Sequence, residues 1–143
     1  MTATADLASA RTAALDYLSA MEDRRLDDAR RHVGPGVSMI FPGGRTFASV
    51  EEIAASSGGR YAEVRKTVER SESWHAGTRI AVLVTGTLYG RWADGEAFDG
   101  IRFADRFEFE NGRIVRQEVW NDAGERRLAR AGIGETAGAG AAR

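Results

Sequence analysis

The chain contains no cysteine and has very little histidine, lysine or proline. Without cysteine it has no disulfide framework, no thiol nucleophile and no thiolate metal ligand. With only two histidines, His32 and His75, it cannot build a zinc site from several imidazoles. No apolar run reaches the roughly 18 residues of a membrane-spanning helix, and Met1–Ala10 lacks the basic start and apolar run of a secretory signal. We therefore expect a cytoplasmic protein with no metal, no cofactor and no membrane contact.

The chain also has no large excess of charge of either sign, because the formal net charge of its 143 residues is only −1. Arginines are many and Lys66 is the only lysine, but carboxylates accompany the arginines along the whole chain. No basic stripe follows the sequence, so we expect no nucleic-acid partner. We attribute the excess of arginine over lysine to genome composition and give it no functional weight. The hydrophobic fraction of 43% and the length indicate one ordinary globular domain.

The N-terminal third has the pattern of two helices. Apolar residues recur at helical spacing from Leu7 to Met21, and either Thr4 or Asp6 can act as the N-cap. A second, short helix is predicted over Leu26–Val33 and ends at the Gly-Pro-Gly sequence that follows it.

A short strand and a third helix follow. Val37–Phe41 is an apolar strand, and Gly43–Arg45 forms a turn without the spacing of a phosphate-binding loop. Ser49 and Glu52 form a capping box that opens the third helix. A Ser-Ser-Gly-Gly run can break this helix before Tyr61–Arg65.

The rest of the chain is dominated by strands. Four are predicted: Thr67–His75, Arg79–Tyr89, Ile101–Phe109 and Ile114–Asn121. Helices followed by a run of antiparallel strands indicate an α+β fold, a curved antiparallel sheet with three helices packed on its concave face around a pocket. Residues 1–131 form this single domain, and we expect the Gly- and Ala-rich tail of residues 132–143 to be disordered.

Asp105 interrupts the apolar face of its predicted strand, between Phe103 and Phe107. An unpaired carboxylate among aromatic rings is costly, so we expect a raised pKa or a polar partner. A protonated Asp105 can donate a hydrogen bond to a developing oxyanion, whereas an ionised one can act as a base. The structural alternative is that the carboxylate pairs with a neighbouring arginine or lies at a sheet bulge.

The loop between the last two strands decides which side chains face the pocket beside Asp105. A three-residue loop ending at Gly112 places Asp105 opposite Gln117. It turns three side chains of the last strand inward: Gln117, Val119 and Asn121. A two-residue Asn-Gly turn shifts the pairing by one residue and turns Glu118 and Trp120 inward instead.

We favour the three-residue loop because it pairs Phe107 with Val115 rather than with Arg116. Trp120 then lies on the outer face of the sheet, alongside Ala104. An exposed tryptophan on a sheet face suggests a partner, and we expect a homodimer through this face.

Two segments of the chain resemble bacterial ketosteroid isomerase, which shares a cone-shaped fold with nuclear transport factor 2 and the SnoaL-like cyclases. The segment from Tyr17 to Pro42 can be laid on that enzyme without a gap, and Tyr17 falls on its oxyanion-hole tyrosine. The strand of Asp105, followed by a turn and Gly112–Ile114, is similar to the strand that bears the enzyme's protonated aspartate. The resemblance implies the NTF2-like, cystatin-like α+β fold and an oxyanion-binding pair of Tyr17 and Asp105.

The chain departs from that enzyme at Phe41, which stands where the family has its proton-shuttling aspartate. We therefore do not expect steroid isomerisation by the usual mechanism. The segment Gly100–Asp122 is closer to SnoaL-like bacterial proteins, many of which end in a similar Val-Trp-Asn-Asp. The Arg-x-Asp arrangement of the related limonene epoxide hydrolases is missing from Arg79–Tyr89.

The remaining candidate site residues are an imidazole and a set of lining side chains. Histidine is the side-chain type whose ordinary pKa is near neutral, and His75 is the histidine expected near the pocket. The alternative is that His75 is exposed to solvent. Substrate-binding candidates are Met39, Phe41, Trp74, Phe103, Gln117, Val119 and Asn121. The alternative for the apolar members of this set is that they are core residues.

The leading interpretation is a cofactor-free acid–base enzyme of the isomerase, cyclase or hydratase type. In it, Tyr17 and Asp105 polarise the oxygen of a small organic carbonyl or polycyclic compound, and Gln117 and Asn121 orient that compound. A non-catalytic carrier for a small apolar or aromatic ligand is the second interpretation, favoured by the loss of the acid at Phe41. A dimeric interaction domain with a filled core is the third.

Overall fold

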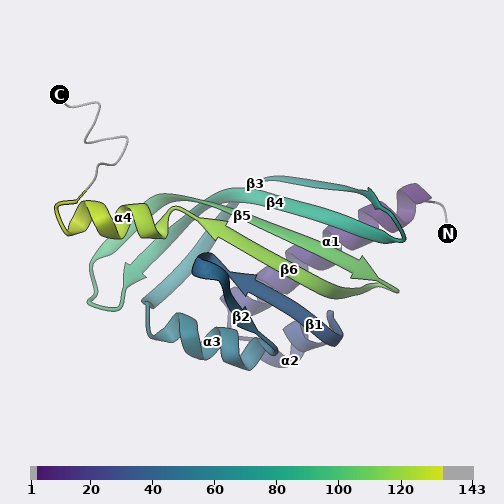
Figure 1. Ribbon diagram of the computed structural model, residues 1–143, viewed down its shortest axis with the longest axis horizontal. Helices are drawn as coiled ribbons and strands as arrows, with labels where there is room; N and C mark the ends of the chain where they lie inside the picture. The colour runs from purple at the N-terminus through teal and green to yellow at the C-terminus, as the bar shows by residue number, and fades with distance from the viewer. Residues whose placement is uncertain (1–2, 134–143) are drawn as a thin grey trace.

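Six strands form one curved sheet in the order β2-β1-β6-β5-β4-β3 (Figure 1). The computed structural model describes residues 3–133. Neighbouring strands run antiparallel, except that β1 is parallel to β6. The strands are β1 Val33–Phe41, β2 Arg45–Phe47, β3 Tyr61–Ala76, β4 Arg79–Trp92, β5 Ala97–Glu110 and β6 Arg113–Asn121.

Three helices lie on the concave side of this sheet, as predicted: α1 Ala3–Glu22, α2 Leu26–Arg30 and α3 Val50–Gly58. A fourth helix, α4, spans Ala123–Arg130 and lies at the end of the sheet where β6 finishes (Figure 1). The α+β class and the unclosed sheet with helices on its concave side are confirmed. No helix within residues 3–133 has the length and hydropathy needed to cross a membrane.

The core lies between α1 and the concave face of β4 and β5. Side chains spaced by three or four residues on α1, among them Ala14, Tyr17 and Met21, are buried against the sheet. The period of two predicted for β5 is confirmed, because its odd-numbered residues from Ile101 to Phe109 are all buried. Burying one large apolar side chain stabilises the fold by about 1.5–3 kcal/mol, so this face fixes where α1 lies.

Several predicted boundaries are wrong. Helix α1 begins at Ala3, before both proposed N-caps, so Thr4 and Asp6 lie inside its first two turns. The Gly-Pro-Gly segment lies within β1 rather than after a helix. The predicted break of the third helix in the Ser-Ser-Gly-Gly run is confirmed, since α3 ends at Gly58. The strand after it begins at Tyr61 and not at Thr67, and the Tyr61 ring stacks on Trp92 at 5.5 Å. Tertiary packing across the sheet decides this segment, and its local sequence does not reveal it.

The capping box of α3 is confirmed in part. The hydroxyl of Ser49 accepts a hydrogen bond from the backbone N–H of Glu52 at 3.2 Å. The Glu52 carboxylate reaches one residue further back than expected, to the N–H of Ala48 at 2.7 Å. These two bonds fix the start of the helix that forms one wall of the pocket described below.

The hairpin between β5 and β6 uses the turn that we did not favour. Asn111 and Gly112 form a two-residue turn with positive φ at both positions. Val115 is then left unpaired as a β-bulge, so Asp105 lies opposite Val119 rather than Gln117. The predicted pairing is wrong by two residues.

The predicted inward face of β6 is nevertheless correct, since the bulge adds one residue and restores the parity of the strand. Gln117 and Val119 are buried, and Trp120 is exposed.

The C-terminal boundary also differs from the prediction. Gly132, with a φ of 79°, and Ile133 close α4 through backbone bonds to Ala129 and Leu128. These two residues therefore belong to the helix cap and not to a disordered tail. The rest of the predicted tail, residues 134–143, lies outside the described residues.

Candidate functional site

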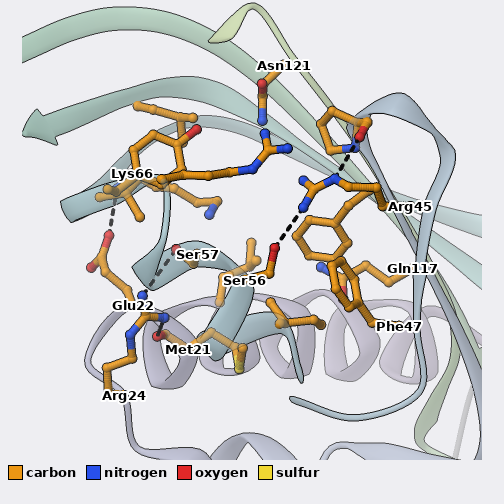
Figure 2. Close-up of a pocket in the computed structure, with 18 of the residues that line it drawn as sticks. Met21, Glu22, Arg24, Arg45, Phe47, Ser56, Ser57, Lys66, Gln117 and Asn121 are labelled. Atoms are coloured by element: carbon orange, nitrogen blue, oxygen red, sulfur yellow. Dashed lines mark hydrogen bonds between the residues drawn. The ribbon is translucent and has the colours of Figure 1, made fainter. Parts of the chain in front are cut away.

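A pocket of about 110 Å³ opens between α1, α3 and the concave face of the sheet (Figure 2). Eight of its 19 lining residues are apolar: Leu18, Met21, Phe41, Pro42, Phe47, Ile53, Val64 and Leu88. An engineered protein cavity of about 150 Å³ is large enough for benzene. This pocket is somewhat smaller but open to solvent, so it encloses about one ring of an organic molecule, and a second ring would extend into its opening.

A chain of three polar side chains runs from this pocket into the core. The hydroxyl of Tyr17 donates to Oε1 of Gln117 at 2.9 Å, and Nε2 of Gln117 donates to Oδ2 of Asp105 at 3.1 Å. Tyr17 and Gln117 line the pocket, whereas Asp105 lies behind them. Sequence analysis predicted that Tyr17 and Asp105 act as a pair, and the structure links them through Gln117.

Asp105 is buried among apolar side chains, with 2% of its surface exposed. Its Oδ1 has no hydrogen-bond partner among the described residues. Burial raises the pKa of Asp105, and the charge of Lys66 together with the hydrogen bond from Gln117 opposes that rise. The protonated acid is thus favoured at this position far more than at the surface.

The structure explains why Tyr17 keeps its proton. Burial raises the pKa of the Tyr17 phenol, and the neighbouring carboxylate of Asp105 raises it further. Its ring meets Phe107 edge to face, with centroids 5.7 Å apart. Tyr17 is therefore a fixed, neutral phenol in the lining of the pocket, with its hydroxyl bonded to Gln117.

Four cationic side chains line the pocket: Arg24, Arg45, Arg60 and Lys66. The three arginines are exposed or half-buried, and we call the part of the pocket that they line its mouth. The Lys66 ammonium lies deeper, 5.4 Å over the ring of the buried Phe103. In Figure 2, Arg24 and Lys66 lie toward the left end of the pocket and Arg45 lies toward the right end. Sequence analysis missed this group, because it treated Arg45 as part of a turn and gave the arginines no weight. No local pattern reveals it, since the four residues come from separate parts of the chain.

Two of these arginines are held by neutral oxygen atoms. Arg45 donates to Ser56 Oγ at 2.7 Å and to the Pro42 carbonyl at 3.1 Å. Arg24 donates to Ser57 Oγ at 3.2 Å, and both bonds to α3 appear in Figure 2. Burial lowers the pKa of Arg45, and the positive charge of Arg60 lowers it further.

The predicted lining residues divide into three groups. Phe41, Gln117 and Asn121 line the pocket. Three are buried in the core instead: Met39, Phe103 and Val119. The structure does not bring Trp74 or His75 to the pocket: both are exposed near the far end of β3, and Arg106 lies over the Trp74 ring on the outer face.

The pocket has one lining carboxylate, Glu22. Its Oε1 accepts the backbone N–H of Lys66 at 2.6 Å, and its Oε2 lies 3.4 Å from Arg65. Among residues 3–133 no group of three or more His, Cys, Asp and Glu side chains is placed to hold a metal ion. The polar side chains that line the cavity are two phenols (Tyr17 and Tyr61), two amides (Gln117 and Asn121), two hydroxyls (Ser56 and Ser57), one engaged carboxylate and four cations.

Solved structures with the same architecture include proteins from several bacteria. An NTF2-like protein of unknown function from Burkholderia pseudomallei is 23% identical, with a TM-score of 0.68 over 85% of this chain and 95% of that one. TerC, co-crystallised with polyporic acid, is 20% identical, with a TM-score of 0.68 over 87% and 97%. A putative SnoaL-like polyketide cyclase from a Jannaschia species is 17% identical, with a TM-score of 0.67 over 85% and 91%. At these identities the likeness shows the fold.

No curated protein shows significant sequence similarity to the chain. The family model described as the SnoaL-like domain matches residues 14–117, which is more than half of the chain and includes Tyr17, Asp105 and Gln117. The protein therefore belongs to the SnoaL-like domain family, and its fold is that of the NTF2-like proteins.

Proposed function

We propose that the pocket binds a small organic carbonyl or enol compound and that Tyr17 donates a hydrogen bond to its oxygen. The observation that carries this proposal is the buried chain from Tyr17 through Gln117 to Asp105. Membership of the SnoaL-like domain family supports it, as does similarity to a putative polyketide cyclase. We place the protein in the cytoplasm, in keeping with a chain that has no cysteine.

The protonation state of Asp105 decides where the Tyr17 proton points. The two ends of the Gln117 amide have the same shape, so it fits between its neighbours in either orientation. When Asp105 is ionised, Gln117 donates a hydrogen bond to it and accepts a hydrogen bond from the Tyr17 hydroxyl. When Asp105 is protonated, it donates to the amide oxygen, and Nε2 donates to the Tyr17 oxygen. The Tyr17 proton is then free to bind a ligand oxygen.

A hydrogen bond from a buried phenol stabilises the negative charge that develops on a carbonyl oxygen during enolisation. This chemistry suits an isomerase, cyclase or hydratase that needs no cofactor. In it a water molecule in the pocket accepts the proton that leaves carbon, because the one lining carboxylate is already engaged. Removal of one oxyanion-hole donor typically slows an enzyme about 100- to 1000-fold. We therefore assign to Tyr17 the stabilisation of the oxyanion and to Asp105 and Gln117 the positioning of its proton.

A non-catalytic binding protein is the second candidate. One observation favours it: the lining carboxylate, Glu22, is already engaged by the Lys66 N–H and by Arg65. An occupied carboxylate is a poor proton acceptor, so proton removal has no free base at the wall. This candidate predicts binding without turnover.

The first test is titration with 2-naphthol, whose ionisation is visible by ultraviolet absorption. We expect the wild-type protein to bind it and to lower the pKa of its hydroxyl. Tyr17→Phe should weaken binding about tenfold and abolish that shift, because one hydrogen bond to a charged oxygen is lost. Tyr89→Phe, an exposed tyrosine on β4, is the matched control and should behave as wild type.

Asp105→Asn tests whether Asp105 positions the Tyr17 proton, as proposed, or acts on the ligand itself. The amide that this substitution introduces mimics the protonated acid, so the variant should keep the ionisation shift and extend it to higher pH. Loss of the shift in Asp105→Asn, or normal binding in Tyr17→Phe, would contradict the proposal.

Hydrogen–deuterium exchange of 2-tetralone, followed by NMR, distinguishes enzyme from carrier. Catalysed exchange at the carbon next to the carbonyl, lost in Tyr17→Phe, is expected of the enzyme. Binding of 2-tetralone with exchange no faster than in buffer would favour the carrier.

A further inference from the structure

The four cations that line the pocket form no ion pair with a carboxylate among the described residues. Within residues 3–133, none of Arg24, Arg45, Arg60 and Lys66 lies within 4.0 Å of a carboxylate oxygen. Arginines on the outer face of the sheet are paired instead: Arg79 and Arg106 share Glu108, at 2.7 and 2.5 Å. The chain as a whole carries one more carboxylate than it has lysines and arginines. The mouth is therefore a local excess of positive charge on a nearly neutral protein.

Neutral atoms hold two of these cations without cancelling their charge. Arg45 uses Nε and Nη1 to bind Pro42 and Ser56, and Arg24 is held by Met21 and Ser57. A guanidinium group has five N–H donors, so each arginine keeps donors for another partner. A cation that is already oriented loses less entropy when it binds an anion.

Repulsion between two of the cations points to an anion as the missing partner. The charge of Arg60 disfavours the charged form of Arg45, which is itself partly removed from water. A single anion at the mouth would relieve this repulsion and bind both guanidinium groups. A neutral ligand would leave it in place.

A small inorganic anion fits the inner part of the pocket poorly. Below the mouth the walls are apolar, and Phe41 and Phe47 meet edge to face with centroids 5.3 Å apart. A molecule that satisfies both regions has an anionic group at one end and a ring or apolar body at the other.

We propose that this pocket selects organic acids, compounds that carry a carboxylate on a carbonyl-bearing or aromatic body. The carboxylate binds Arg45 and Arg60 at the mouth, and the body extends toward Tyr17. This inference rests on the proposed function, because it names the class of ligand for the same pocket. The organic-acid proposal depends on the arginines at the mouth, whereas the oxyanion proposal depends on Tyr17.

The test compares 2-naphthol with 6-hydroxy-2-naphthoate, which adds a carboxylate to the same rings, by calorimetric titration. We expect wild-type protein to bind the naphthoate at least about tenfold more tightly, as one charge-assisted hydrogen bond allows. Arg60→Gln should remove most of this preference, measured as the ratio of the affinities for the two ligands. Added salt should weaken binding of the naphthoate alone.

The control variant is Arg70→Gln, which removes one positive charge from an exposed position on β3. It should keep the preference for the naphthoate. Arg60 makes no side-chain hydrogen bond within the described residues, so urea unfolding of Arg60→Gln should match wild type and exclude misfolding as the cause.

The outcomes separate the two proposals. In one outcome the protein prefers the naphthoate, the preference depends on Arg60, and Tyr17→Phe has no effect on the pKa of bound naphthol. This outcome supports the organic-acid proposal and overturns the oxyanion role of Tyr17. Equal binding of the two ligands, or a preference that survives Arg60→Gln, overturns the organic acid and leaves the oxyanion role standing. Binding of neither ligand overturns both.

Discussion

Asp105 is a carboxyl group in the core with one hydrogen-bond partner, Gln117, and one oxygen atom without any among the described residues. Leaving a buried polar atom unpaired typically costs about 1–3 kcal/mol. A protonated carboxyl lowers the cost, because it carries no charge and can donate to Gln117. The folded protein therefore holds a proton at Asp105 at a pH where the unfolded chain releases it.

This difference in proton binding makes stability depend on pH. Because the folded pKa is raised, the folded state binds more protons than the unfolded state once the pH exceeds the unfolded value near 3.9. Above that pH, stability should fall as pH rises, by up to about 1.4 kcal/mol per pH unit, until the folded group also ionises. Urea unfolding at a series of pH values between acid and neutral measures this slope.

Asp105→Asn should flatten this slope, whereas Asp99→Asn, an exposed position on the same strand, should keep it. An equal slope in wild type and Asp105→Asn would show that Asp105 is ionised in the folded protein.

Individual residues differ in how far sequence predicts them. Asp105 could be found because it breaks an alternation that is confirmed along all of β5. Its link to Tyr17 came from a resemblance, and the amide that joins them could not be assigned to that role from spacing. Arg45 and Arg60 could not be found, because a shared mouth depends on how α3, β2 and β3 meet in space.

At the level of the elements, the β-bulge at Val115 is decisive. Strand propensity and alternation predicted β6 and its buried side chains, but not the pairing. We chose the loop that paired Phe107 with Val115, and the protein instead combines the tighter turn with an unpaired Val115. Both solutions bury Gln117, so the hydrophobic pattern could not distinguish them.

Gly86 marks the closest approach of β3 to β4. A Cβ atom at Gly86 would lie 1.9 Å from the Thr67 carbonyl oxygen, beside the irregularity between Val68 and Arg70. Gly86→Ala should therefore push these strands apart and destabilise the protein by about 3 kcal/mol. The measurement is urea unfolding.

Gly58→Ala, in the last turn of α3 with nothing within 4 Å of the added atom, is the control and should change stability by less than about 1 kcal/mol. A Gly86→Ala protein as stable as this control would show that the strands adjust at no cost.

The whole molecule has two different faces. Helices cover the concave side of the sheet (Figure 1), while the outer side exposes 53% of the Trp120 surface next to a hollow lined in part by Thr85, Thr87 and Ala104. Several charged side chains on this face are paired within the chain, Arg79 and Arg106 with Glu108 and Arg116 with Glu118, which lowers the cost of covering them. We propose that two copies associate through this face, each placing Trp120 in the hollow of the other.

Light scattering during gel filtration tests this association. Wild-type protein should have the mass of a dimer, and Trp120→Glu should have that of a monomer because a charge would be buried at the contact. Leu128→Glu, which replaces an exposed apolar residue on α4, should remain dimeric. A monomeric wild type in the micromolar range would exclude this arrangement.

The placement of the three tryptophans has a spectroscopic consequence. Trp74 and Trp120 are exposed on the outer face, while Trp92 is only 3% exposed and stacks on Tyr61, a residue of the pocket wall. A soluble quencher such as acrylamide should therefore quench the fluorescence of Trp74 and Trp120 more strongly than that of Trp92. The unquenched emission then responds to ligands in the pocket, and the quenchable part responds to whatever covers the outer face, so one fluorescence experiment follows both sides of the sheet separately.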